Sequence, residues 1–164
     1  MNAPIDGLRN RTWEELKVGD EAAIEKTVGA RDLYLFAHAS GNLNPLHMPS
    51  FDVDNDGISD AVAPSMWVGS LISSVLGNVL PGPGTLYRQQ SFDFVGRAHV
   101  GDVITIHVRL LEKLESPDVV FETIVSKVGG PVIAAGKAIV SAPTEHITLS
   151  HQDLPPLLLE EHDH

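Results

Sequence analysis

The chain has 164 residues, of which 11 are Lys or Arg and 22 are Asp or Glu, so its formal net charge is −11. This length fits one domain with its own core, and so acidic a chain is unsuited to binding nucleic acid or an anionic membrane surface. The sequence contains no cysteine, which excludes disulfides, thiolate metal sites and cysteine nucleophiles.

The N-terminal part of the chain predicts a strand, a short helix and a loop. Residues 1–17 are polar and lack the apolar core of a signal peptide, so we expect a cytoplasmic protein. Residues 21–28 alternate weakly and indicate a strand. Residues 30–40 place Leu33, Phe36 and Ala37 on one face of a helix. Residues 41–49 hold two prolines, two asparagines and a glycine, which is typical of a loop.

Residues 64–80 predict the main helix. Pro64 suits a first helical turn, and the residues that follow are apolar or small nearly all the way round, which is typical of a buried helix. Glycines and serines interrupt the apolar stretch, and it is too short and too polar to span a bilayer.

A period of two follows the run Pro-Gly-Pro-Gly at 81–84 and predicts four strands, over 85–95, 103–111, 119–128 and 132–142. One helix followed by an antiparallel meander is an α+β arrangement. The pattern stops at Pro143. We therefore expect one domain over residues 1–144 and a tail or interdomain linker over 145–164.

The segment 40–47, Ser-Gly-Asn-Leu-Asn-Pro-Leu-His, is the most informative part of the sequence. Read by itself, it is a tight loop that follows a helix and presents His47 beside the amides of Asn42 and Asn44. A solvated loop histidine and a catalytic one both fit this pattern.

The segment resembles the motif of MaoC-like (R)-specific enoyl-CoA hydratases, Ser-Gly-Asp-x-Asn-Pro-x-His. Ser40, Gly41, Asn44, Pro45 and His47 agree with it, whereas an Asn at position 42 stands where the motif has Asp. The resemblance covers roughly residues 11–144. It includes Phe36-Ala37, Leu80-Pro81-Gly82-Pro83-Gly84-Thr85, Tyr87, Gln90, Phe92, Phe94 and Val100-Gly101-Asp102.

The resemblance implies a hot-dog fold, in which a long central helix is wrapped by a curved antiparallel sheet. It also implies a homodimer or a higher even-numbered oligomer. The implied reaction is hydration of a trans-2-enoyl-CoA to an (R)-3-hydroxyacyl-CoA, and neither a cofactor nor a metal is expected.

Hydration of an enoyl thioester requires a positioned water, a base for that water and an acid for the α-carbon. The family holds the water between the Asp and the His, and a backbone N–H at the start of the central helix polarises the thioester carbonyl. By resemblance His47 is the acid and base, Asn42 only orients the water because an amide does not exchange protons usefully, and the Ser65 N–H is the oxyanion donor. The substrate contacts implied are Asn44, Pro64, Met66, Trp67 and Gln90; Met66 and Trp67 also fit core positions.

The helix start is a second departure, because the family has His-Gly-Met where this chain has Pro64-Ser65-Met66. With two departures, two functions stay open: a hydratase of reduced activity, and a non-catalytic acyl-CoA-binding or regulatory domain. The second draws on a likeness to the N-terminal MaoC-like part of bifunctional enoyl-CoA hydratase/phosphate acetyl- or butyryltransferases. A phosphotransacetylase domain or partner is then expected.

Three further patterns are weaker. Residues 52–57, Asp-Val-Asp-Asn-Asp-Gly, resemble the start of a calcium loop, but its twelfth position is Ala63 instead of Glu, so we expect an acidic surface loop. The histidines lack the spacing of zinc ligands. The candidates for contacts with CoA phosphates, each of which also fits ordinary surface charge, are Arg88, Arg97, Arg109 and Lys113.

Overall fold

The computed structural model describes residues 8–149 and 154–158. Its elements in chain order are β1 (Leu8–Arg9), β2 (Glu21–Thr27), α1 (Ala30–Ser40), the short 3-10 helix η1 (Pro45–His47), α2 (Ser65–Asn78), β3 (Leu86–Gln90), β4 (Asp93–Phe94), β5 (Val103–Lys113), β6 (Asp118–Lys127), β7 (Val132–Ser141) and β8 (Thr148–Leu149).

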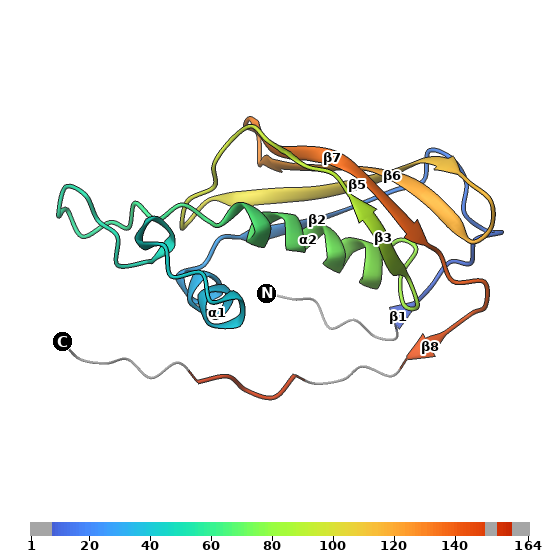
Figure 1. Cartoon of the computed structure of the whole chain (residues 1–164), viewed down its shortest axis with the longest axis horizontal. Coiled ribbons are helices and arrows are strands. Elements are labelled where there is room, and N and C mark those ends of the chain that lie inside the picture. Colours follow the sequence, from blue (N-terminus) through green and yellow to red (C-terminus); the bar gives the residue numbers. More distant parts are fainter. Residues whose placement is uncertain (1–7, 150–153, 159–164) are drawn as a thin grey trace.

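One antiparallel sheet of six strands forms the body of the molecule. Its order is β2-β5-β6-β7-β3, with β4 also paired to β7. The sheet curves over α2, which lies along its inner side (Figure 1). Alternate residues of β5 point to the helix, and Ile104, Ile106, Val108 and Leu110 are fully buried, as the period of two requires. The predicted α+β hot-dog fold is confirmed.

The central helix α2 has one buried face and one open face. Trp67, Val68 and Ile72 are packed in the core, whereas Met66 is 62% exposed and Ser70 is exposed. The expectation of a helix buried nearly all round is therefore wrong, because its apolar and small residues alone do not reveal which face the sheet covers. Among the described helices, none has the length and apolar character needed to cross a membrane.

The strand expected over 85–95 is two strands. β3 ends at Gln90, β4 begins at Asp93, and both pair with β7. The break lies against Gly136, where an added Cβ would overlap the carbonyl oxygen of Ser91. The backbones approach so closely there that only glycine fits, and the edge strand bends around that point.

Part of the predicted tail belongs to the folded domain. β8 pairs with β1. The Asn10 side chain holds residues 145–147 with two hydrogen bonds: its Nδ2 donates to the Glu145 carbonyl at 2.6 Å, and its Oδ1 accepts from the Ile147 N–H at 2.8 Å. In residues 154–158, Leu154 and Leu158 are about 90% exposed. The remainder of the expected tail lies outside the described residues.

The turn between residues 99 and 102 fixes the start of β5. Asp102 Oδ2 accepts from the His99 N–H at 2.8 Å and lies 2.8 Å from Lys127 Nζ. Burial by itself would raise the pKa of Asp102, but the hydrogen bonds from Lys127 and His99 outweigh it and hold the pKa below its ordinary value.

Asp102→Asn is expected to lower the free energy of unfolding at neutral pH by about 1 kcal/mol. Because the folded-state pKa is depressed, the contribution of this carboxylate is full above its unfolded pKa and disappears as pH falls through the folded value. Urea unfolding at neutral pH and at about pH 3 measures both, and the deficit should shrink in acid. The exposed Asp93→Asn is the matched control. A deficit equal at both pH values would contradict this account.

Candidate active site

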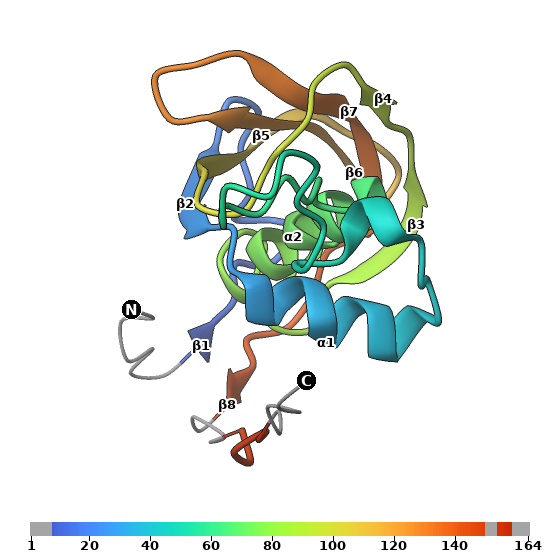
Figure 2. The ribbon, with the colours of Figure 1, turned by 90° about the vertical axis from the view of Figure 1, so that its left-hand side faces the viewer.

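A pocket of about 250 Å³ opens at the N-terminal end of α2. Figure 2 shows α1 and the loop that follows it at this end of the molecule. The pocket is lined by Leu46, His47, Val62, Ala63, Ser65, Val68, Phe94, Gly96, Arg97, Ala98 and Ile133.

The loop that carries His47 folds through its own side chains. Gly41 ends α1 in the left-handed conformation, with φ of 72°. The side-chain oxygen of Asn42 then accepts from the Asn44 N–H, and that of Asn44 accepts from the Leu46 N–H, both at 3.2 Å. Asparagine favours such turns because its side chain reaches its own backbone two residues on. The order of residues in the motif thus builds the turn that delivers His47.

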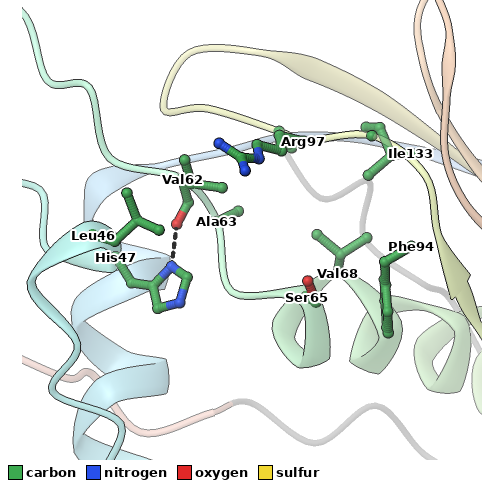
Figure 3. A pocket seen from close by; sticks show the side chains of 11 residues that line it. Leu46, His47, Val62, Ala63, Ser65, Val68, Phe94, Arg97 and Ile133 are labelled. Carbon is green, nitrogen blue, oxygen red and sulfur yellow. Dashed lines mark hydrogen bonds between the residues drawn. The ribbon is translucent and has the colours of Figure 1, made fainter.

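The His47 ring is oriented by one strong contact. Its Nδ1 lies 2.7 Å from the Val62 carbonyl oxygen (Figure 3). In the neutral ring Nδ1 must carry the proton to donate there, which leaves Nε2 as an acceptor. The Val62 N–H in turn donates to the Leu46 carbonyl at 3.0 Å, so loop and ring are fixed together. A histidine held in this way can take a proton from a bound water.

The start of α2 borders the same pocket through Ser65. Pro64 is the N-cap and offers no side-chain hydrogen bond, so the first-turn N–H groups have no side-chain cap. Ser65 is the first helical residue, and its side chain is exposed. The helix dipole favours negative charge at this end. The arrangement can therefore stabilise an oxyanion next to His47.

Of the predicted site residues, the structure brings His47 and Ser65 together in the pocket lining. Trp67 is buried in the core, and the side-chain amide of Gln90 donates to the Ser91 carbonyl at 2.8 Å and to Thr123 Oγ1 at 3.0 Å. The other predicted contacts also lie outside the lining, and their roles toward substrate stay predictions. They are Asn42, half-buried in its turn, the exposed Asn44, the buried Pro64 and the exposed Met66.

Several lining residues were not predicted. Val62, Ala63 and Ala98 enter through backbone pairing, since the Ala63 N–H donates to the Ala98 carbonyl at 2.8 Å. No local pattern reveals a contact between segments so far apart in the sequence. Phe94 does carry a sequence signal, because it agrees with the family, but the resemblance implies no role for it in the site.

The four cationic residues that were candidates for contacts with CoA phosphates differ in their surroundings. Arg97 lines the pocket. Arg88 is engaged with Ser141 Oγ at 2.8 Å, Lys113 lies 4.0 Å from the centre of the Trp13 ring, and Arg109 is exposed on β5, whose alternate residues face the core. Arg97 is therefore the one of these four residues that shares the pocket with His47.

The acidic loop folds on itself. Carboxylate oxygens of Asp52, Asp54 and Asp60 lie within 4.8 Å of one another. Asp52 Oδ2 accepts from the Gly57 N–H at 3.0 Å and Asp60 Oδ2 from the Val53 N–H at 2.9 Å. The observed group includes Asp60, which lies outside the segment 52–57 that resembles the start of a calcium loop, and the bonds account for the shape of the loop.

No family model matches the chain, but individual relatives do. It is 34% identical over 139 residues to an (R)-specific enoyl-CoA hydratase of Rhodospirillum rubrum, which covers 84% of this chain and 96% of that protein. It is 32% identical over 131 residues to the (R)-specific enoyl-CoA hydratase of Aeromonas caviae, which covers 79% of this chain and 98% of that protein.

Solved structures agree with these relatives. The unliganded R-hydratase from Pseudomonas aeruginosa matches with a TM-score of 0.87 and 33% identity, over 94% of this chain and 99% of that one. A MaoC-like dehydratase from Rhodospirillum rubrum matches with a TM-score of 0.64 over 88% of this chain and 99% of that one, and at 16% identity it supports the fold alone. The chain belongs to the family of MaoC-like (R)-specific enoyl-CoA hydratases.

Proposed function

We propose that this chain hydrates trans-2-enoyl-CoA thioesters to (R)-3-hydroxyacyl-CoA, at a rate reduced by Asn42. The observation that carries the proposal is the shared pocket of His47, held by Val62 at 2.7 Å, and the start of α2, whose N–H groups have no side-chain cap. The (R)-specific hydratases among its relatives support the same reaction.

In the proposed mechanism the thioester carbonyl accepts from the Ser65 N–H, and the dipole of α2 stabilises the charge that develops on its oxygen. His47 Nε2 takes a proton from a water whose oxygen adds to the β-carbon. The protonated ring then delivers a proton to the α-carbon. One water is added across the double bond, and the ring returns to its starting state without a cofactor.

The amide of Asn42 can hold the attacking water but cannot exchange a proton with it. His47 must therefore act without the carboxylate that the family motif supplies. The Ser65 side chain adds bulk where the family has Gly. Both departures act on turnover more than on thioester binding.

The same departures favour a second candidate, a non-catalytic acyl-CoA-binding domain associated with a phosphate acetyl- or butyryltransferase. Crotonyl-CoA separates the two. A hydratase lowers the enoyl absorbance of crotonyl-CoA because it removes the double bond. A binding domain leaves that absorbance unchanged and still binds the saturated butyryl-CoA. A cytoplasmic location stays a prediction.

We also propose a homodimer or higher even oligomer. In the described part of the chain, β3 and β4 form a free edge of the sheet, and Leu86 in β3 and Val95, which follows β4, are both 67% exposed. Such an edge invites pairing unless it is covered, and the open face of α2 with Met66 adds apolar surface. Light scattering at micromolar concentration should give an even multiple of 17.7 kDa.

Leu86→Lys should weaken that association, because it places a charge on the free edge. Val18→Lys is the matched control, since Val18 is 64% exposed and is not part of this edge. A wild-type monomer at micromolar concentration would refute the proposed assembly.

A further inference from the structure

Arg97 is a guanidinium on the wall of the pocket that holds His47 and Ser65. Figure 3 shows the three side chains around that pocket. The residues lining the pocket include no Asp or Glu. Within residues 8–149 and 154–158, ion pairs join other cations to carboxylates, such as Arg11 to Asp20, but none involves Arg97. The mechanism proposed above does not use this charge.

The backbone on both sides of Arg97 is fixed. The Gly96 N–H donates to the Ile133 carbonyl at 3.0 Å, and the Ala98 carbonyl accepts from the Ala63 N–H at 2.8 Å. An added Cβ on Gly96 would lie 2.7 Å from the Val132 carbonyl oxygen, so the segment that follows β4 lies directly against the start of β7. Ala63 follows Val62, whose carbonyl orients His47. The backbone segments that carry Arg97 and His47 are thus joined by one set of hydrogen bonds.

A guanidinium without a protein carboxylate is a binding group for carboxylate or phosphate oxygens. In an enoyl-CoA the phosphates lie at the far end of the long pantetheine arm from the thioester. The pocket of about 250 Å³ already contains the proposed reacting centre. Because the pantetheine arm between thioester and phosphates is uncharged, an anionic group that meets Arg97 beside the reacting centre belongs to the acyl chain.

We propose that Arg97 determines specificity by binding a carboxylate at the end of a short acyl chain, so that the protein prefers thioesters of dicarboxylic acids. The inference rests on the proposed function of the pocket and names its substrate class. The Arg97 side chain is exposed, so water screens the pair. We expect about tenfold in affinity, which is at the low end of hydrogen bonds to charged groups.

The test compares two saturated thioesters of equal shape by calorimetry. Succinyl-CoA ends in a carboxylate, and isocaproyl-CoA replaces its two oxygens by methyl groups. Wild type should bind succinyl-CoA more tightly. Arg97→Met should weaken the binding of succinyl-CoA about tenfold and leave the binding of isocaproyl-CoA unchanged. Arg97→Lys should retain part of the preference, because lysine keeps the charge but cannot bind both carboxylate oxygens as the planar guanidinium does. Arg109→Met removes the same charge elsewhere on the surface and should preserve the preference.

A second thioester, succinyl-N-acetylcysteamine, shows whether Arg97 binds the acyl carboxylate or a phosphate of CoA, because this thioester lacks the phosphates. The proposal requires Arg97→Met to weaken this thioester as well. Equal weakening of both CoA thioesters with no effect on the cysteamine thioester would assign Arg97 to a CoA phosphate and overturn the proposal, as would no effect at all. Thermal unfolding confirms that each variant is folded. Hydration of crotonyl-CoA by the wild type is scored separately, so loss of the proposed function is distinguishable from loss of this specificity.

Discussion

Asn42→Asp is expected to raise the rate of crotonyl-CoA hydration by about 10² to 10⁴, the usual contribution of a positioned acid or base. This corresponds to a barrier lowered by about 3 to 5 kcal/mol. The loop should tolerate the change, because the side-chain oxygen of Asn42 only accepts from the Asn44 N–H and a carboxylate oxygen accepts equally well. Loss of enoyl absorbance at saturating substrate measures kcat.

Asn44→Asp is the matched control for this gain of activity. Its side-chain oxygen accepts from the Leu46 N–H at the same 3.2 Å, so the two substitutions make the same chemical change two residues apart. Only Asn42→Asp should accelerate the reaction. A wild type that turns over at tens per second and gains nothing from Asn42→Asp would place the base elsewhere, first in the acidic loop at 52–56. A variant that binds acyl-CoA but stays inert would favour the binding domain.

His47→Ala is expected to abolish hydration while changing acyl-CoA binding little. The ring supplies the single proton-exchanging group of the proposed mechanism, so its removal should cost at least about 10² in rate. It also removes the contact to the Val62 carbonyl, and the free energy of unfolding should fall by about 1 kcal/mol. Both quantities are measured on the same preparation, by absorbance and by urea unfolding.

His47→Asn separates chemistry from folding. Its amide nitrogen can replace Nδ1 as the donor to Val62, but nothing replaces Nε2, so stability should be largely restored without activity. His38→Ala, at an exposed position in α1, should change neither. A hydration rate that His47→Ala leaves untouched would show that the site is wrongly assigned.

Local patterns predicted the elements of this fold well where a single physical cause decides them. The helix over 30–40 has the predicted bounds because Gly29 precedes it and Gly41 ends it with positive φ. The buried strands follow the period of two. The prediction of one continuous strand over 85–95 was wrong, because the break in it depends on the close approach of Ser91 to Gly136 on β7. No alternation of side chains along the sequence reveals that contact.

The site was predictable only in part for the same reason. His47 and Ser65 could be named because the motif loop and the helix start are each readable locally. Their common pocket depends on long-range backbone pairing, such as that between Ala63 and Ala98. Trp67 fits both a substrate contact and a core position, and it packs in the core. The sequence does not decide between the two, because a helix of apolar and small residues has no polar face to mark its orientation.

Incubation of wild-type protein with crotonyl-CoA, beside a binding measurement with butyryl-CoA, tests the central claim most directly. We predict that butyryl-CoA binds, and that crotonyl-CoA is converted slowly to (R)-3-hydroxybutyryl-CoA, above the rate in buffer and above that of His47→Ala. Binding of butyryl-CoA with no hydration by the wild type would contradict the proposed activity.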